Sequence, residues 1–237
     1  MLKTRGNKIT WLGHSTFQIT TPGGQVVLID PWLTGNPSCP AALKKPVRVD
    51  TLLISHGHGD HLGDTVALAK QFKPRIACNY EIHLWLASKG VGDTMPMNKG
   101  GSQKVGDIEV TMVHAFHSSG IEDGGKVVYA GEPCGWIVRL PGGLTLYHAG
   151  DTAVFGDMKL IGELYAPELA LLPIGDLYTM GPREAALAIR MLNVKHVAPM
   201  HYGTFPPLTG TPAALRELTQ DILHLDIYDL NPGESLG

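Results

Sequence analysis

Residues 52–64 read LLISHGHGDHLGD, an apolar stretch that runs directly into four side chains able to bind a metal ion. Residues two apart in an extended chain point to the same side, so His56 and His58 can hold one ion together. Asp60 and His61 follow where the chain turns toward a helix, and they can reach a second position. The glycines between the ligands allow sharp bends. This order predicts a strand that ends at a metal site.

The donor atoms of this motif limit the metal and the chemistry. Neutral imidazole and carboxylate suit zinc first, and they also suit manganese or iron. A polar loop with incidental histidines would explain one histidine, but it explains this cluster poorly. The sequence contains no Gly-x-Ser-x-Gly segment, so nothing supports a covalent serine mechanism.

Short apolar or alternating segments, bounded by turn residues, predict a chain rich in strands. The predicted strands are 9–12, 16–20, 25–29, 51–54, 108–113, 135–140, 144–147, 169–172 and 196–199. Helices are predicted over 65–72, 81–89, 157–165, 182–192 and near 212–223. Asp64 is the predicted N-cap of the first helix, and Gly90 follows the second.

A hairpin pattern occurs twice, 119 residues apart. Residues 17–24 read FQITTPGG and precede a strand that ends at Asp30, and residues 136–143 read WIVRLPGG and precede a strand that leads to Asp151. Pro-Gly-Gly is a common hairpin turn, so the repeat alone is weak. Its spacing of half the chain predicts two similar β-rich halves, roughly 1–120 and 121–237. They would form one domain, with sheet packed on sheet and helices outside.

The His-x-His-x-Asp-His motif resembles the hallmark of the metallo-β-lactamase superfamily, and further motifs of that family have counterparts in order along the whole chain. The resemblance implies an α+β fold, a four-layer αββα sandwich with mostly antiparallel mixed sheets and a metal centre at their edge. It implies two divalent metal ions. The first would be bound by His56, His58 and His117, the second by Asp60, His61 and His201, and Asp151 would bridge both. His114 competes with His117 for its place.

More narrowly, the chain is similar to uncharacterised metal-dependent hydrolases related to bacterial ascorbate-phosphate lactonases. The similar stretches are GHS at 13–15, DPWLTGNP at 30–37, YAGE at 129–132, AGDT at 149–152, PIGD at 173–176, TMGP at 179–182 and PMHYGTF at 199–205. The resemblance implies a hydrolase in which a metal-bridging hydroxide cleaves a small ester, lactone or phosphodiester. Asp60 would orient that hydroxide.

Two polar residues near the motifs are candidates for supporting roles. His14 is predicted to line the cleft as a catalytic residue that contacts substrate or the metal-bound water; the alternative is a histidine in a surface turn. Asp30 is predicted to hold a ligand such as His56 or His58; the alternative is a turn aspartate before Pro31.

Three later residues have weaker assignments. Asp176 either supports a ligand, faces the substrate or lies in a turn that leads to a helix. Tyr202, together with Thr204, is a candidate donor to a substrate oxygen. His148 is interpreted as a core or surface histidine.

Charge argues against the competing functions. Lys and Arg number 19 against 22 Asp and Glu, and no basic run exceeds Lys44-Lys45. A metal-dependent nuclease acting on RNA or DNA is therefore the disfavoured alternative, and a small molecule is the expected partner.

The ligand set argues against two further functions. Flavin-linked di-iron enzymes of the superfamily have Glu where this chain has His58, and the complete ligand set disfavours a non-catalytic binding module.

The sequence also bears on location and assembly. It contains no apolar run of membrane-spanning length and no signal-peptide pattern at its start, and its three cysteines are far apart. A reducing cytoplasm fits best. A homo-oligomer remains open.

Overall fold

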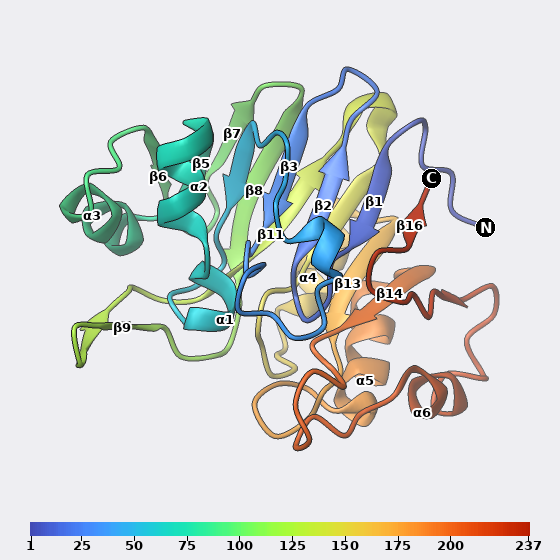
Figure 1. Cartoon of the computed structure of the whole chain (residues 1–237). Helices are drawn as coiled ribbons and strands as arrows, with labels where there is room; N and C mark the ends of the chain where they lie inside the picture. Colours follow the sequence, from blue (N-terminus) through green and yellow to red (C-terminus); the bar gives the residue numbers. More distant parts are fainter.

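Two seven-stranded sheets lie face to face in the computed structural model, which describes residues 1–237 (Figure 1). The first sheet contains, in spatial order, β16 (Ser235–Leu236), β1 (Lys8–Trp11), β2 (Phe17–Thr20), β3 (Val26–Ile29), β4 (Thr51–Leu53), β5 (Arg75–Asn79) and β6 (Thr94–Met97). The second contains β15 (Asp226–Ile227), β14 (His196–Met200), β13 (Leu169–Pro173), β12 (Thr145–His148), β11 (Cys134–Arg139), β8 (Ile108–His114) and β7 (Ser102–Val105).

The two sheets share one pattern of strand pairing. In the first, the pairs from β16 to β3 are antiparallel and those from β3 to β6 are parallel. In the second, the pairs from β7 to β12 are antiparallel and those from β12 to β15 are parallel. Each sheet thus has three pairs of each kind, where we expected antiparallel pairs to predominate.

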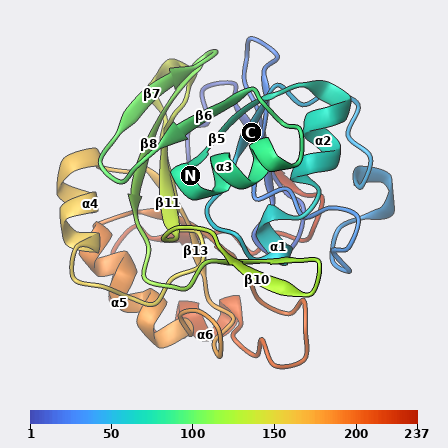
Figure 2. The same cartoon turned by 90° about the vertical axis from the view of Figure 1, so that its left-hand side faces the viewer.

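Alternation along the strands divides the apolar side chains into three layers. Leu53 and Leu146 belong to the core between the sheets, whereas their neighbours Leu52 and Tyr147 belong to the outer cores. Each outer core is closed by helices, as Figures 1 and 2 show. The predicted αββα sandwich is therefore confirmed.

The helices cover opposite faces of the sandwich. The first sheet is covered by α2 (Thr65–Phe72) and α3 (Tyr80–Ser88), and the second by α4 (Met158–Tyr165), α5 (Pro182–Leu192) and α6 (Pro212–Glu217). A single turn, α1 (Gly59–Leu62), precedes α2. The last helix, α6, ends at Glu217 rather than near residue 223.

The predicted cap of α2 is wrong in its chemistry. Asp64 occupies the N-cap position, but its side chain makes no capping bond. Its Oδ2 instead accepts the backbone N–H groups of Leu33 (2.7 Å) and Thr34 (2.8 Å), which fixes the chain that leaves β3. Gly90 follows α3 with a left-handed φ of 77°, as its place after the helix predicts.

The repeated Pro-Gly-Gly segments form turns closed by the same hydrogen bond, although the first glycine has a left-handed φ only in the second turn, at Gly142. In the first, the Gly24 N–H donates to the Thr21 carbonyl at 2.9 Å, and in the second the Gly143 N–H donates to the Leu140 carbonyl at 3.0 Å. Both glycines have left-handed φ values, 83° and 87°, that side chains disfavour. The first hairpin joins β2 to β3, and the second joins β11 to β12.

The change from the first sheet to the second comes earlier in the chain than residue 120. It falls between β6 and β7, so residues 102–114 belong to the second sheet. The last strand, β16, returns to pair with β1 in the first sheet. The two sheets therefore do not divide the sequence at its midpoint.

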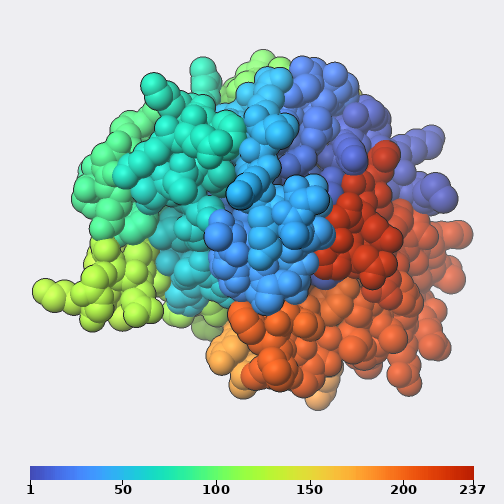
Figure 3. Space-filling model, in the orientation of Figure 1, coloured from blue at the N-terminus to red at the C-terminus, as the bar shows by residue number.

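Several strands escaped the sequence patterns. Pro96 lies within β6, and β7 reads SQKV, so these two edge strands lack an apolar alternation. A separate hairpin of β9 (Gly120–Asp123) and β10 (Lys126–Tyr129) projects from the body, as the yellow-green segment in Figure 3 shows. Among the helices, none is both long and apolar enough to cross a membrane.

The core between the sheets yields a stability prediction. Replacing the fully buried Leu146 by Ala should lower the free energy of unfolding by about 2–5 kcal/mol, because methyl groups are lost and a cavity remains. Urea titration would measure it. The matched change at the exposed Leu187 of α5 should cost under about 0.5 kcal/mol. Equal losses at both sites would contradict the assignment of the central core.

Candidate metal centre

The first motif delivers its ligands from the loop after β4 and from α1. His56 and His58 lie in the loop, and the His56 Nε2 approaches the His58 Nδ1 to 3.0 Å. Asp60 and His61 lie in α1. Between His56 and His58, position 57 requires a glycine, because a Cβ there would lie 2.5 Å from the Ala130 Cβ.

The later ligands come from the second sheet. Asp151 follows β12, His201 follows β14 with a left-handed φ of 55°, and His117 follows β8. The Asp151 Oδ2 lies 3.2 Å from the His61 Nε2, 3.0 Å from the His201 Nε2 and 3.7 Å from the His117 Nε2. Asp151 therefore stands between ligands from both halves of the chain.

The structure brings all seven expected ligands together. Their donor atoms form three overlapping groups in which the atoms lie within 4.8 Å of one another. These groups are His56, His58 and His117; His56, His61 and Asp151; and His14, Asp60, His61 and His201. His114 is in none of them, and its Nδ1 instead lies 2.9 Å from the Lys99 Nζ.

The donor set fits a cation. Ligand atoms 2.0–2.1 Å from zinc in a tetrahedron lie about 3.3 Å apart, close to the shorter separations here. The His61 Nε2 and the Asp151 Oδ1 are buried without a hydrogen-bond partner. Buried polar atoms are rarely left unpaired, so these atoms call for a ligand that the chain does not supply.

The charges of the centre lead to the same conclusion. Burial would raise the pKa of Asp151, but His201 and His61 hold it well below its usual range. Burial would lower the pKa of His61, but Asp151, Asp30 and Asp60 together raise it well above its usual range. Asp151 therefore stays ionised and favours a positive charge at this point.

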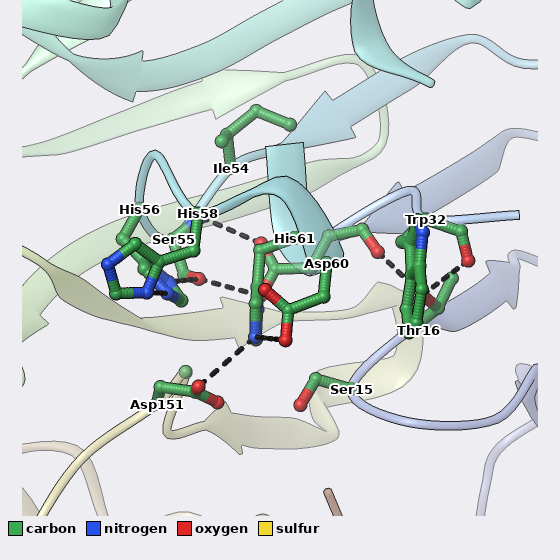
Figure 4. A network of polar contacts seen from close by, with 12 residues as sticks. Ser15, Thr16, Trp32, Ile54, Ser55, His56, His58, Asp60, His61 and Asp151 are labelled. Atoms are coloured by element: carbon green, nitrogen blue, oxygen red, sulfur yellow. Dashed lines mark hydrogen bonds and ion pairs between the residues drawn. The ribbon is translucent and has the colours of Figure 1, made fainter. Parts of the chain in front are cut away.

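A buried carboxylate, that of Asp30, fixes the orientation of His61 and His56, two of the histidines labelled in Figure 4. The His61 Nδ1–H donates to the Asp30 Oδ2 at 2.8 Å, which leaves Nε2 facing the site. Ser55 donates its hydroxyl to the same oxygen at 2.6 Å, and its Oγ lies 2.9 Å from the His56 Nδ1. Asp30 thus contacts His61 directly and His56 through Ser55, whereas we expected direct contact with His56 or His58.

His14 lies inside the site rather than in a surface turn. It is fully buried with a left-handed φ of 54°. Its Nε2–H donates to the Asp60 Oδ2 at 3.0 Å, and its Nδ1 lies 2.9 Å from the Thr204 Oγ1. Burial lowers the pKa of His14 to about 4, so the ring is neutral. Both ring nitrogens of His14 are therefore engaged by the protein. The side chain contacts Asp60, whereas we expected it to contact the substrate or the metal-bound water.

Two expected site residues point elsewhere. Asp176 lies in an exposed turn with a φ of 68°, where its Oδ1 accepts the Leu177 N–H at 2.8 Å. The Tyr202 hydroxyl lies 3.5 Å from the Asp229 Oδ1, and its ring stacks on Trp11 at 5.4 Å. Neither contacts the ligands, so the turn interpretation of Asp176 fits and the donor role of Tyr202 does not.

His148 is a core histidine, as interpreted. Its Nε2 donates to the Ser15 carbonyl at 2.9 Å, and its Nδ1 accepts the Gly150 N–H at 3.1 Å. Sequence reasoning missed Ser55, although it directly precedes the motif. Serine is a common residue, so its place next to a ligand histidine does not by itself indicate a supporting role.

Comparison with known proteins agrees with this geometry. The β-lactamase superfamily domain matches residues 25–202. Relatives described as UPF0173 metal-dependent hydrolases include one from Solibacter usitatus, 57% identical over 96% of this chain and 98% of its own. Another, from Koribacter versatilis, is 53% identical over 98% of both chains. The chain therefore belongs to the β-lactamase superfamily and, within it, to the UPF0173 metal-dependent hydrolases.

A solved structure supports the fold over the whole chain. The metallo-hydrolase Igni18 from Ignicoccus hospitalis superposes with a TM-score of 0.86 and 34% sequence identity, covering 97% of each chain. The architecture is thus the metallo-β-lactamase fold.

Asp30 offers a test of the ligand support. Asp30→Asn should weaken zinc affinity about 10- to 100-fold, because His61 and Ser55 lose an ionised acceptor. A competition titration with a zinc-binding dye would measure it. Asp176→Asn, in the exposed turn, should leave the affinity unchanged. Unchanged affinity in Asp30→Asn would mean that this carboxylate does not support the site.

Proposed function

We propose that this chain is a hydrolase that binds two divalent metal ions, zinc or manganese, and cleaves a small ester, lactone or phosphodiester. The observation that carries the proposal is the convergence of seven His and Asp side chains, two of which contribute buried atoms without partners, the His61 Nε2 and the Asp151 Oδ1. The relatives described as metal-dependent hydrolases support it.

The ligands divide between two positions. His56, His58 and His117 would hold the first ion, Asp60, His61 and His201 the second, and Asp151 both. Ions bound there lower the pKa of water and so supply a hydroxide nucleophile at neutral pH. In the net reaction, the oxygen of water bonds to the acyl carbon or phosphorus, the bond to the leaving oxygen breaks, and an acid and an alcohol result.

Asp60 is the residue best placed to orient the attacking water. Burial would raise the pKa of Asp60, but His61 and His14 hold it well below its usual range, so the carboxylate is an acceptor at neutral pH. His14 fixes its direction from one side, and Thr204 fixes His14. His14 is therefore a positioning residue.

Metal analysis tests the proposal directly. Protein purified without a His tag or chelator should contain about two zinc or manganese ions per chain by plasma mass spectrometry. Asp151→Ala should lose most of both, because it removes the shared carboxylate. Asp176→Ala is the matched control and should keep both ions. The loaded protein should hydrolyse at least one ester, lactone or phosphodiester. Less than half an ion per chain, not restored by added metal, would refute the proposal.

His14 can be tested separately from metal binding. His14→Asn keeps a side chain that tolerates a left-handed φ but removes the ring that reaches Asp60 and Thr204. We expect kcat to fall about 10- to 100-fold, with KM and metal content little changed, because Asp60 is misdirected. Normal turnover would exclude the positioning role.

A further inference from the structure

The metal centre opens to solvent at three of its ligands. The side chains of Asp60 and His117 are 31% and 14% exposed, and His58 is half-buried. The other four ligands are buried. A substrate must therefore approach past Asp60, His58 and His117.

An aromatic wall stands on the Asp60 side of this opening. The Trp32 and Phe205 ring centroids are 6.0 Å apart, and they lie 5.1 Å and 5.9 Å from that of His14. In the view of Figure 4, Asp60 lies between His56 and Trp32. Phe205 is 39% exposed although it packs against these rings. The aromatic wall is thus continuous with the imidazole ring of His14, which is hydrogen-bonded to Asp60.

A second exposed aromatic residue directly precedes His117. Phe116 is 63% exposed, and its ring centroid lies 6.3 Å from that of His114, outside the ligand groups. Its N–H donates to the Thr152 Oγ1 at 3.0 Å, and its carbonyl accepts the Ala153 N–H at 3.0 Å. Its backbone is therefore fixed beside the loop that carries Asp151, but the aromatic wall itself consists of Trp32 and Phe205.

Exposed aromatic residues also occur far from the site, as Tyr80 on α3 illustrates, and single ones need no explanation. Phe205 differs because it packs on Trp32 and His14 and keeps a free face beside the opening. Ligand sites typically combine such an apolar wall with a few placed polar groups.

From this arrangement we infer that the substrate carries an alkyl or aryl group next to the carbonyl or phosphoryl group that reacts, and that this apolar group packs against Trp32 and Phe205. The inference rests on the proposed function, since the metal centre must receive the reacting group. It narrows the esters, lactones and phosphodiesters of that function to those with an apolar substituent. Phe205 is then a specificity-determining residue.

Hydroxamates test the wall without requiring turnover. They bind metals through two oxygens and carry an acyl chain of chosen length. Each methylene removed from water strengthens binding about fourfold, and a chain along an open wall is only partly buried. Zinc-loaded wild type should therefore bind octanohydroxamate at least about 10-fold more tightly than acetohydroxamate in calorimetry.

The variants locate the effect. Phe205→Ala should reduce this ratio to under about threefold while metal content stays the same, because the chain loses its contact surface. Phe205→Leu should keep most of the ratio. Tyr80→Ala, an exposed aromatic on α3, should keep all of it. The same ranking is expected for kcat/KM on 4-nitrophenyl octanoate against 4-nitrophenyl acetate.

The outcomes separate the two proposals. Equal binding of both hydroxamates by metal-loaded wild type, or an unchanged ratio in Phe205→Ala, would overturn the apolar wall and leave the hydrolase proposal standing. Failure of the metal-loaded protein to bind either hydroxamate would count against the metal centre itself, and the inference would fall with it.

Discussion

His61 is held between two aspartates that come from different sheets. Its Nδ1 lies 2.8 Å from Asp30, which follows β3, and its Nε2 lies 3.2 Å from Asp151, which follows β12. Both carboxylates are buried, where an unpaired charge costs several kcal/mol. The two sheets must therefore meet at the position that pairs both charges. The other ligands depend on this junction, because the loops that carry them leave the same sheets.

The repeated hairpin explains why these aspartates occupy related positions. By its place in the pairing pattern, β3 of the first sheet corresponds to β12 of the second, and β1 corresponds to β8. Asp30 directly follows β3 and Asp151 lies three residues after β12, so both come from the same end of corresponding strands, yet one supports a ligand while the other faces several. His14 and His117 are counterparts, since each lies three residues after its strand. The two halves share one arrangement of strands, but the metal-binding motif that follows β4 gives the corresponding residues different roles.

Local chemistry determines which parts of this arrangement the sequence can predict. The predicted strands were placed within a residue or so, because both faces of each must be apolar, but the buried strand β5 was missed. The polar edge strand β7 carried no such pattern. Ligands within the first motif followed from spacing, but His117, Asp151 and His201 needed the family resemblance. The errors at Asp176 and Tyr202 arise where left-handed residues interrupt the chain. Asp176 itself has a φ of 68°, and His201 before Tyr202 has one of 55°. Strand alternation no longer predicts side-chain direction there.

The unpartnered atoms link metal binding to the stability of the fold. The His61 Nε2 and the Asp151 Oδ1 are buried polar atoms that gain no hydrogen bond from folding. Each is a cost that the core must offset unless a cation satisfies it. A ligand that binds the folded chain and not the unfolded one stabilises the fold in proportion to the logarithm of its concentration. The buried support around Asp30 keeps the ligands in place, and the exposed side of Asp60 and His117 stays open to substrate. One end of the sandwich thus combines a rigid interior with a reactive surface.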